Sequence, residues 1–77
     1  MHVYSVVYTA HAGDASRGLT SVIKRESPIT DDLDLRVLAE DLRKASVIMA
    51  IDVGDNRPRE YPAERITINN LSYLGNH

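Results

Sequence analysis

Residues 30–45 read TDDLDLRVLAEDLRKA and predict the helix around which the rest of the chain folds. Apolar side chains recur in this segment with the spacing that places them on one face of a helix. The members of this apolar stripe are Leu33, Leu35, Val37, Leu38, Leu42 and Ala45. Thr30 is a suitable N-cap, and the aspartates after it lie where the helix dipole favours negative charge. A helix with such a stripe needs an apolar surface to cover.

Segments on both sides of the helix have the composition of β-strands. Residues 3–10 (VYSVVYTA), 19–25 (LTSVIKR) and 65–71 (RITINNL) are rich in β-branched and aromatic residues. Residues 11–18 contain two glycines with Asp and Ser, which predicts a loose hairpin turn longer than two residues. The first two strands are therefore expected to pair antiparallel.

The part of the chain after the helix is compatible with more than one structure. Residues 46–53 (SVIMAIDV) either extend the helix, because Met49 continues the apolar stripe, or form a strand, which their β-branched residues favour. Residues 57–64 contain two prolines and are predicted to form an extended loop. Tyr73 and Leu74 are expected to fold back onto the sheet before a frayed C-terminus.

Together these elements predict one α+β domain. We expect a small antiparallel-dominated sheet of three to four strands with one amphipathic helix packed on one face, in the order ββαβ or ββαββ. The chain has 77 residues, which suits a single domain with a modest core. It contains no Phe and no Trp, so Val, Ile and Leu must build that core. Tyr4 and Tyr8 share a strand face and are expected to line it.

Composition and charge exclude several classes of function. The absence of Cys rules out disulfides and Cys-based zinc sites, and favours a reducing cytoplasm. No apolar run approaches the roughly 20 residues that span a bilayer, so a membrane partner is not expected. The net charge of −2 argues against a general binder of nucleic-acid phosphates, and direct nucleic-acid binding is not expected.

Residue types that carry chemistry are present but are poorly arranged for it. The three histidines lack the spacing of metal ligands, which favours solvated surface side chains. His11, Asp14 and Ser16 have the residue types of a hydrolase triad, but such triads are assembled from distant elements. We therefore expect no catalytic residue, no metal site and no cofactor.

Two surfaces are candidates for binding a partner. The first is the basic and aromatic segment Arg57, Arg59, Tyr61 and Arg65, and the second is the acidic helix face of Asp31, Asp34 and Asp41. Arg and Tyr are enriched at binding hot spots, although a solvated loop with scattered charge has the same composition. The helix aspartates are explained equally by the helix dipole and by solvation, and alternatively imitate phosphates towards a basic partner.

Three further motifs carry a resemblance. They are Gly18 with Ser21-Val22-Ile23, then Pro28-Ile29-Thr30, then residues 66–74 (ITINNLSYL). In this order they resemble a widespread group of small bacteriophage and prophage proteins with a strand–strand–helix–strand layout. The resemblance implies a cytoplasmic, non-catalytic inhibitor or modulator of a host protein or ribonucleoprotein complex, of the anti-defence or anti-CRISPR kind. A homodimer is compatible with this role.

The alternative function is a small nucleic-acid-binding regulator. It would use the segment from Arg57 to Arg65 together with Lys24 and Arg25. Binding of this kind weakens steeply as salt concentration rises, which separates the two functions experimentally.

Overall fold

The computed structural model describes residues 1–51, 54 and 56–77. Within these residues the elements are β1 (His2–Ala12), β2 (Ala15–Arg25), α1 (Asp32–Ala45), β3 (Val47–Ile51), β4 (Pro58–Pro62) and β5 (Arg65–Asn76). The strands pair antiparallel and accompany one helix, so the α+β class is confirmed. The element order differs from expectation, because the last part of the chain supplies three strands.

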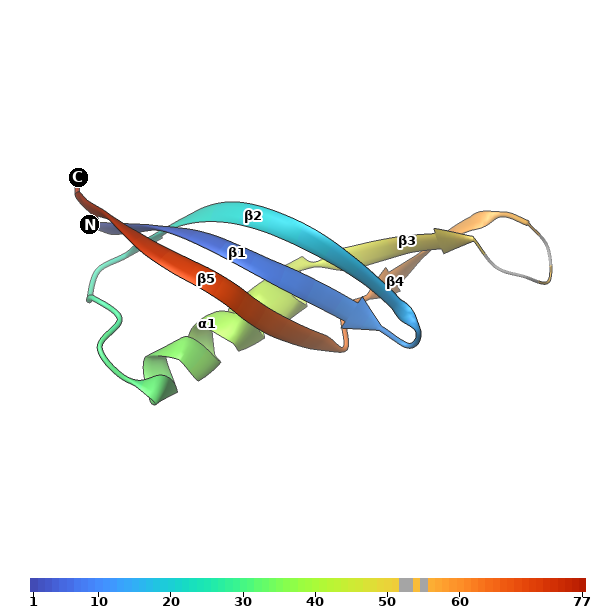
Figure 1. Cartoon of the computed structure of the whole chain (residues 1–77), viewed down its shortest axis with the longest axis horizontal. Helices are drawn as coiled ribbons and strands as arrows, with labels where there is room; N and C mark the ends of the chain where they lie inside the picture. The colour runs from blue at the N-terminus through green and yellow to red at the C-terminus, as the bar shows by residue number, and fades with distance from the viewer. Residues whose placement is uncertain (52–53, 55) are drawn as a thin grey trace.

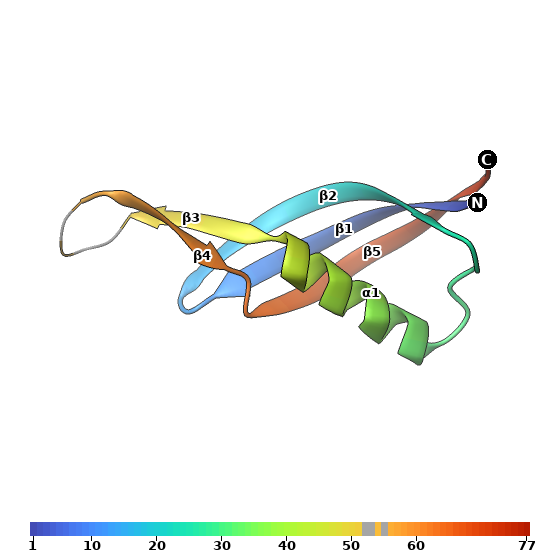
Figure 2. The same ribbon diagram turned by 180° about the vertical axis from the view of Figure 1, so that it is seen from behind.

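The larger sheet has three strands in the order β2-β1-β5 (Figure 1). The central strand β1 pairs with β2 over its whole length and with β5 over nearly as much. The pairing with β5 shifts register between Val3 and Tyr4 and again between Val7 and Tyr8, whereas the pairing with β2 is regular. Helix α1 covers one face of this sheet (Figure 2).

The turn between β1 and β2 is tighter than its sequence predicts. Ala12 pairs with Ala15, so the loop consists of only Gly13 and Asp14. Gly13 has a φ of 58°, a conformation that glycine adopts without steric cost and that suits the first position of a two-residue hairpin. The predicted loose turn is wrong, since Ala15 to Gly18 extend β2 instead.

The C-terminal residues belong to the sheet. Tyr73 and Leu74 lie inside β5, where Tyr73 is the partner of Tyr4, so the predicted fold-back is wrong. The two ends of the chain also bond to each other. The N-terminal amine donates to the carbonyl of His77 at 2.8 Å, and the His77 amide donates to the carbonyl of Met1 at 2.9 Å. β5 extends this far because β1 is long enough to pair with it from His11 back to His2.

The helix begins one residue later than it would if Thr30 were its N-cap. Asp31 is the N-cap, and its carboxylate accepts the amide of Asp34 at 2.9 Å. The carboxylate of Asp34 in turn accepts the amide of Thr30 at 3.1 Å. The prediction of Thr30 as the cap is therefore wrong, because the carboxylate of Asp31 satisfies a free amide of the first turn, while Asp34 binds the residue that precedes the cap.

The main core forms between the helix and the sheet. Leu38 and Leu42 are buried against Val6 and Tyr8 of β1, as the apolar stripe predicts, and Leu35 is half-buried. Tyr4 and Tyr8 are also buried, as expected. The prediction that Leu33 and Val37 belong to the buried stripe is wrong. Leu33 and Val37 remain 66% and 46% exposed, because neighbouring helix positions are about 100° apart and the sheet covers only one side.

Strands β3 and β4 form a separate two-stranded hairpin, which we call the arm. Residues 47–51 are strand and not helix, while Asp52 and Val53 of the ambiguous segment lie outside the described residues. The predicted loop over residues 57–64 is wrong, since Pro58–Pro62 is β4. The two prolines stand at its ends, where a missing amide is tolerated.

The arm extends beyond the sheet in both ribbon views (Figures 1 and 2). The molecule measures 47 × 22 × 17 Å and its radius of gyration is 14.4 Å. A compact chain of this length has a radius of gyration of about 11–12 Å. The arm therefore makes the protein elongated.

Hydrogen bonds of Ser46, Ala63 and Glu64 attach the base of the arm to the rest of the protein. The buried Ser46 ends the helix, and its hydroxyl donates to the carbonyl of Leu42 at 2.6 Å. Its own carbonyl accepts the amide of Ala63 at 3.0 Å, and the amide of Glu64 donates to the carbonyl of His11 at 2.8 Å. The base of the arm is thus bonded to both the helix end and β1.

We predict that Leu38→Ala lowers the free energy of unfolding by about 2–5 kcal/mol, because it removes a buried side chain from a small core. Val37→Ala, one position away on the exposed side, should change it by less than about 0.5 kcal/mol. Urea denaturation followed by circular dichroism measures both. Equal effects of the two substitutions would contradict the helix orientation.

Candidate binding surface on the arm

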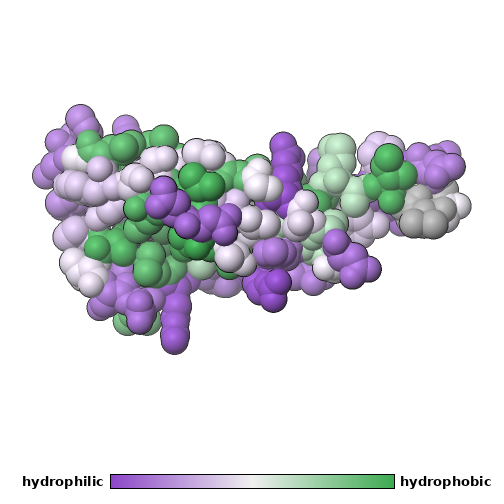
Figure 3. All heavy atoms as spheres, in the orientation of Figure 1, coloured by the Kyte–Doolittle hydropathy of each residue, from purple (hydrophilic) through white to green (hydrophobic). Residues whose placement is uncertain are grey.

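The arm exposes an apolar strip on its outer face. Val47, Met49 and Ile51 alternate along β3 and are 51%, 61% and 69% exposed. Side chains that alternate along a strand point to one face, so these three lie side by side. In Figure 3 hydrophobic residues on the arm lie beside the hydrophilic residues near its tip. We call Val47, Met49 and Ile51 the outer strip.

The inner face of β3 packs against the sheet. Ile48 is 2% exposed and forms a second apolar cluster with Ala10 and Ala63. A strand that is apolar at every position, as VIMAI is, usually lies buried on both faces. Here only the inner face of β3 is covered, so the apolar side chains of the outer strip are exposed although such side chains are usually buried.

The structure brings together part of the predicted basic and aromatic surface. Arg59 and Tyr61 share the inner face of β4, and Arg57 directly precedes that strand. Arg65 lies apart from them as the first residue of β5, opposite His11 in the three-stranded sheet. The predicted surface is therefore divided between the arm and the sheet.

Asp31 and Asp34 of the predicted acidic surface lie at the start of α1, the helix end away from the arm. Asp31 and Asp34 are occupied in capping the helix, and Asp34 also lies 4.0 Å from a guanidinium nitrogen of Arg25. Asp41 is exposed two turns further along α1. The N-terminal end of α1 points away from the arm (Figure 2), so Asp31 and Asp34 lie apart from the residues of the arm.

Glu40 on α1 forms a hydrogen-bonded ion pair with Arg43. It accepts hydrogen bonds from the guanidinium of Arg43, one turn away. This hydrogen bonding holds the pKa of Glu40 below its ordinary value and raises the pKa of Arg43. Both side chains are on the surface, so the pair is part of the solvated side of the helix.

The residues of the considered hydrolase triad lie in and beside the β1–β2 turn, with Ser16 opposite His11. A ring nitrogen of His11, Nε2, lies 3.1 Å from the hydroxyl of Thr67, on the uncovered face of the sheet. Asp14 is in the turn and Ser16 is on β2. In the part of the chain that the structure describes, no three His, Asp or Glu side chains gather closely enough to hold a metal ion. None of the described residues belongs to a helix long and apolar enough to cross a membrane.

Comparisons of the chain with protein-family models, curated proteins and solved structures found no match. The resemblance to phage proteins therefore stays a prediction from the sequence motifs alone.

Sequence reasoning missed the outer strip. The signal was present in residues 47–51, where every side chain is apolar. Composition does not reveal whether both faces of such a strand are covered, because this depends on how many layers pack around it. Tyr61 is 38% exposed.

We predict that Ile48→Ala lowers the free energy of unfolding by about 2–4 kcal/mol, because it empties the cluster at the base of the arm. Met49→Ala should change it by less than about 0.5 kcal/mol, since that side chain faces solvent. Thermal unfolding of the two variants gives the comparison. A greater loss for Met49→Ala would mean that the outer strip is covered within the monomer.

Proposed function

We propose that this protein is a non-catalytic binding protein that attaches to a partner protein through the arm. The observation that carries this proposal is the exposed outer strip on a hairpin bonded at its base to the helix and the sheet. Exposed apolar patches on small proteins commonly mark interaction sites. A two-stranded hairpin is also marginally stable by itself, so a partner that covers the arm stabilises it.

The composition of the arm supports a protein partner. Met49 is flexible and polarisable, and adapts to the shape of an apposed surface. Arg57, Arg59 and Tyr61 provide the residue types most often found at binding hot spots. The arm thus combines an apolar strip with polar anchors, as the centre and rim of a protein interface do.

The partner class follows from the resemblance in the sequence. We propose a host protein or ribonucleoprotein complex as the target, with inhibition or modulation of host defence as the consequence. The alternative, direct nucleic-acid binding, has less support. The net charge is −2, and Arg65, Lys24 and Arg25 lie on the three-stranded sheet and not on the arm.

The test is affinity capture from a bacterial lysate with three forms of the protein. The arm variant Val47→Ser/Met49→Ser removes two of the three apolar side chains of the outer strip, and the control Leu33→Ser/Val37→Ser removes two exposed apolar side chains from the helix. We expect the wild type and the helix control to retain the same partner and the arm variant to lose it, with all three equally folded by circular dichroism.

Two results would contradict the proposal. One is loss of the partner by the helix control with retention by the arm variant. The other is a salt-sensitive shift of DNA or RNA in gel electrophoresis, abolished by Arg57→Ala/Arg59→Ala, which would support the nucleic-acid alternative instead.

A further inference from the structure

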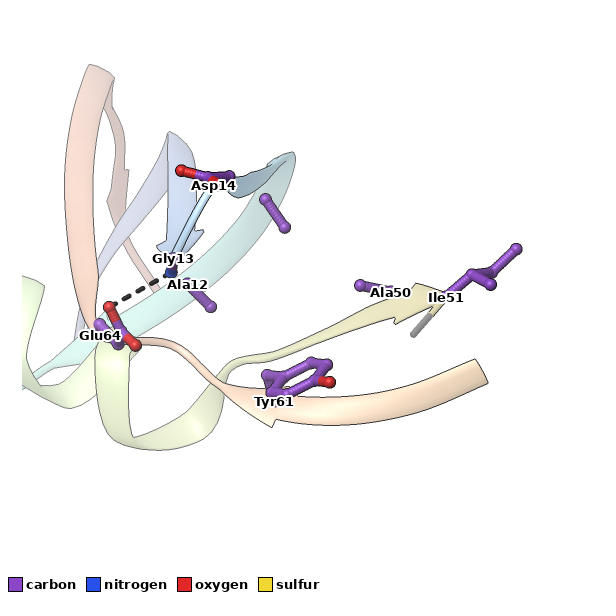
Figure 4. Close-up of a pocket in the computed structure, with 8 residues that line it drawn as sticks. Ala12, Gly13, Asp14, Ala50, Ile51, Tyr61 and Glu64 are labelled. Carbon is purple, nitrogen blue, oxygen red and sulfur yellow. Dashed lines mark hydrogen bonds between the residues drawn. The ribbon is translucent and has the colours of Figure 1, made fainter. Parts of the chain in front are cut away.

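A hollow of about 420 Å³ lies between the inner face of the arm and the β1–β2 turn (Figure 4). Small side chains form much of its wall. Ala12 and Ala15 flank the turn, and Ala50 faces them from β3. Tyr61 lines the hollow from the side of β4 (Figure 4). Because alanine side chains end at Cβ, the space between the two hairpins stays open.

Two acidic residues line this hollow in the part of the chain that the structure describes. Asp14 and Glu64 are the ionisable residues that line it besides the tyrosine, among the residues the structure describes. Glu64 is fixed in place, since one of its carboxylate oxygens accepts the amide of Gly13 at 3.2 Å. Arg59, the neighbouring cation on β4, does not line the hollow. An apolar hollow with a carboxylate rim is complementary to a long side chain with a cationic end.

We propose that this hollow binds an arginine side chain of the partner protein. The methylene stem packs against Ala12, Ala15 and Ala50, and the guanidinium stacks on the ring of Tyr61. Asp14 and Glu64 accept its hydrogen bonds, and such bonds between charged groups are stronger than neutral ones. The planar guanidinium suits both contacts better than the compact ammonium of lysine. This inference rests on the proposed function, in which the arm is the surface that meets the partner.

The first measurement is titration of the ¹⁵N-labelled protein with N-acetyl-arginine-N-methylamide, followed by amide chemical shifts. We expect saturable shifts at residues 12–15, 50, 61 and 64. The blocked citrulline analogue has the same shape without the charge, and should bind several-fold more weakly. Equal binding of the two probes, or shifts spread outside the hollow, would overturn the proposal.

Variants test the role of the named side chains. Glu64→Gln keeps an acceptor for the Gly13 amide and removes the charge, and Ala50→Leu fills the hollow while both carboxylates stay. Each should weaken arginine binding several-fold. The control Asp41→Asn removes one charge from the helix and should leave binding unchanged. If Asp41→Asn weakens binding as much as Glu64→Gln does, the attraction is only to net charge and the proposal fails.

The two proposals fail separately. The arm variant Val47→Ser/Met49→Ser changes no residue that lines the hollow, so it should still bind the arginine probe after it has lost the partner. If a partner binds through the outer strip but arginine does not bind in the hollow, only this inference is contradicted. If arginine binds in the hollow but no partner depends on the arm, only the proposed function is contradicted.

Discussion

Strand β1 is the element on which the rest of the structure depends. It bonds to β2 on one side and β5 on the other, and it supplies Val6 and Tyr8 to the main core. It also supplies Ala10 to the second cluster under the arm. In a chain without Phe or Trp, few side chains are large enough to fill a core, and β1 contributes to both clusters. Helix and arm therefore take their positions from the same strand.

The arm follows from how the helix ends. Ser46 closes α1 with its hydroxyl and bonds to Ala63 with its carbonyl, so β3 leaves the helix directly and β4 returns to the same point. The cluster around Ile48 then packs the base of the arm against the end of the sheet. Beyond that base no second layer covers β3, which leaves Met49 and Ile51 exposed. The hydrogen bonds and packing that anchor the arm are thus at its base.

The two faces of the arm offer different chemistry to a partner. The outer strip consists of three uncharged apolar side chains. It contributes to binding through the apolar area that a partner would bury. The inner face borders a hollow with the ring of Tyr61 and two carboxylates, which contributes direction and specificity. A partner that grips the hairpin from both sides would use both, and would also stabilise a hairpin that has little support of its own.

The sequence alone determined the helix, the strands around it and the apolar residues Leu38 and Leu42, because helical and strand periodicities are local properties of the chain. It also excluded cysteine chemistry outright. Only the tertiary structure decided that Leu33 and Val37 stay exposed, that residues 58–62 pair as a strand, and that Arg65 lies apart from Arg57 and Arg59. These outcomes depend on which faces acquire a second layer and which segments meet as partners. Contacts between residues far apart in the chain set both, and no local pattern encodes them.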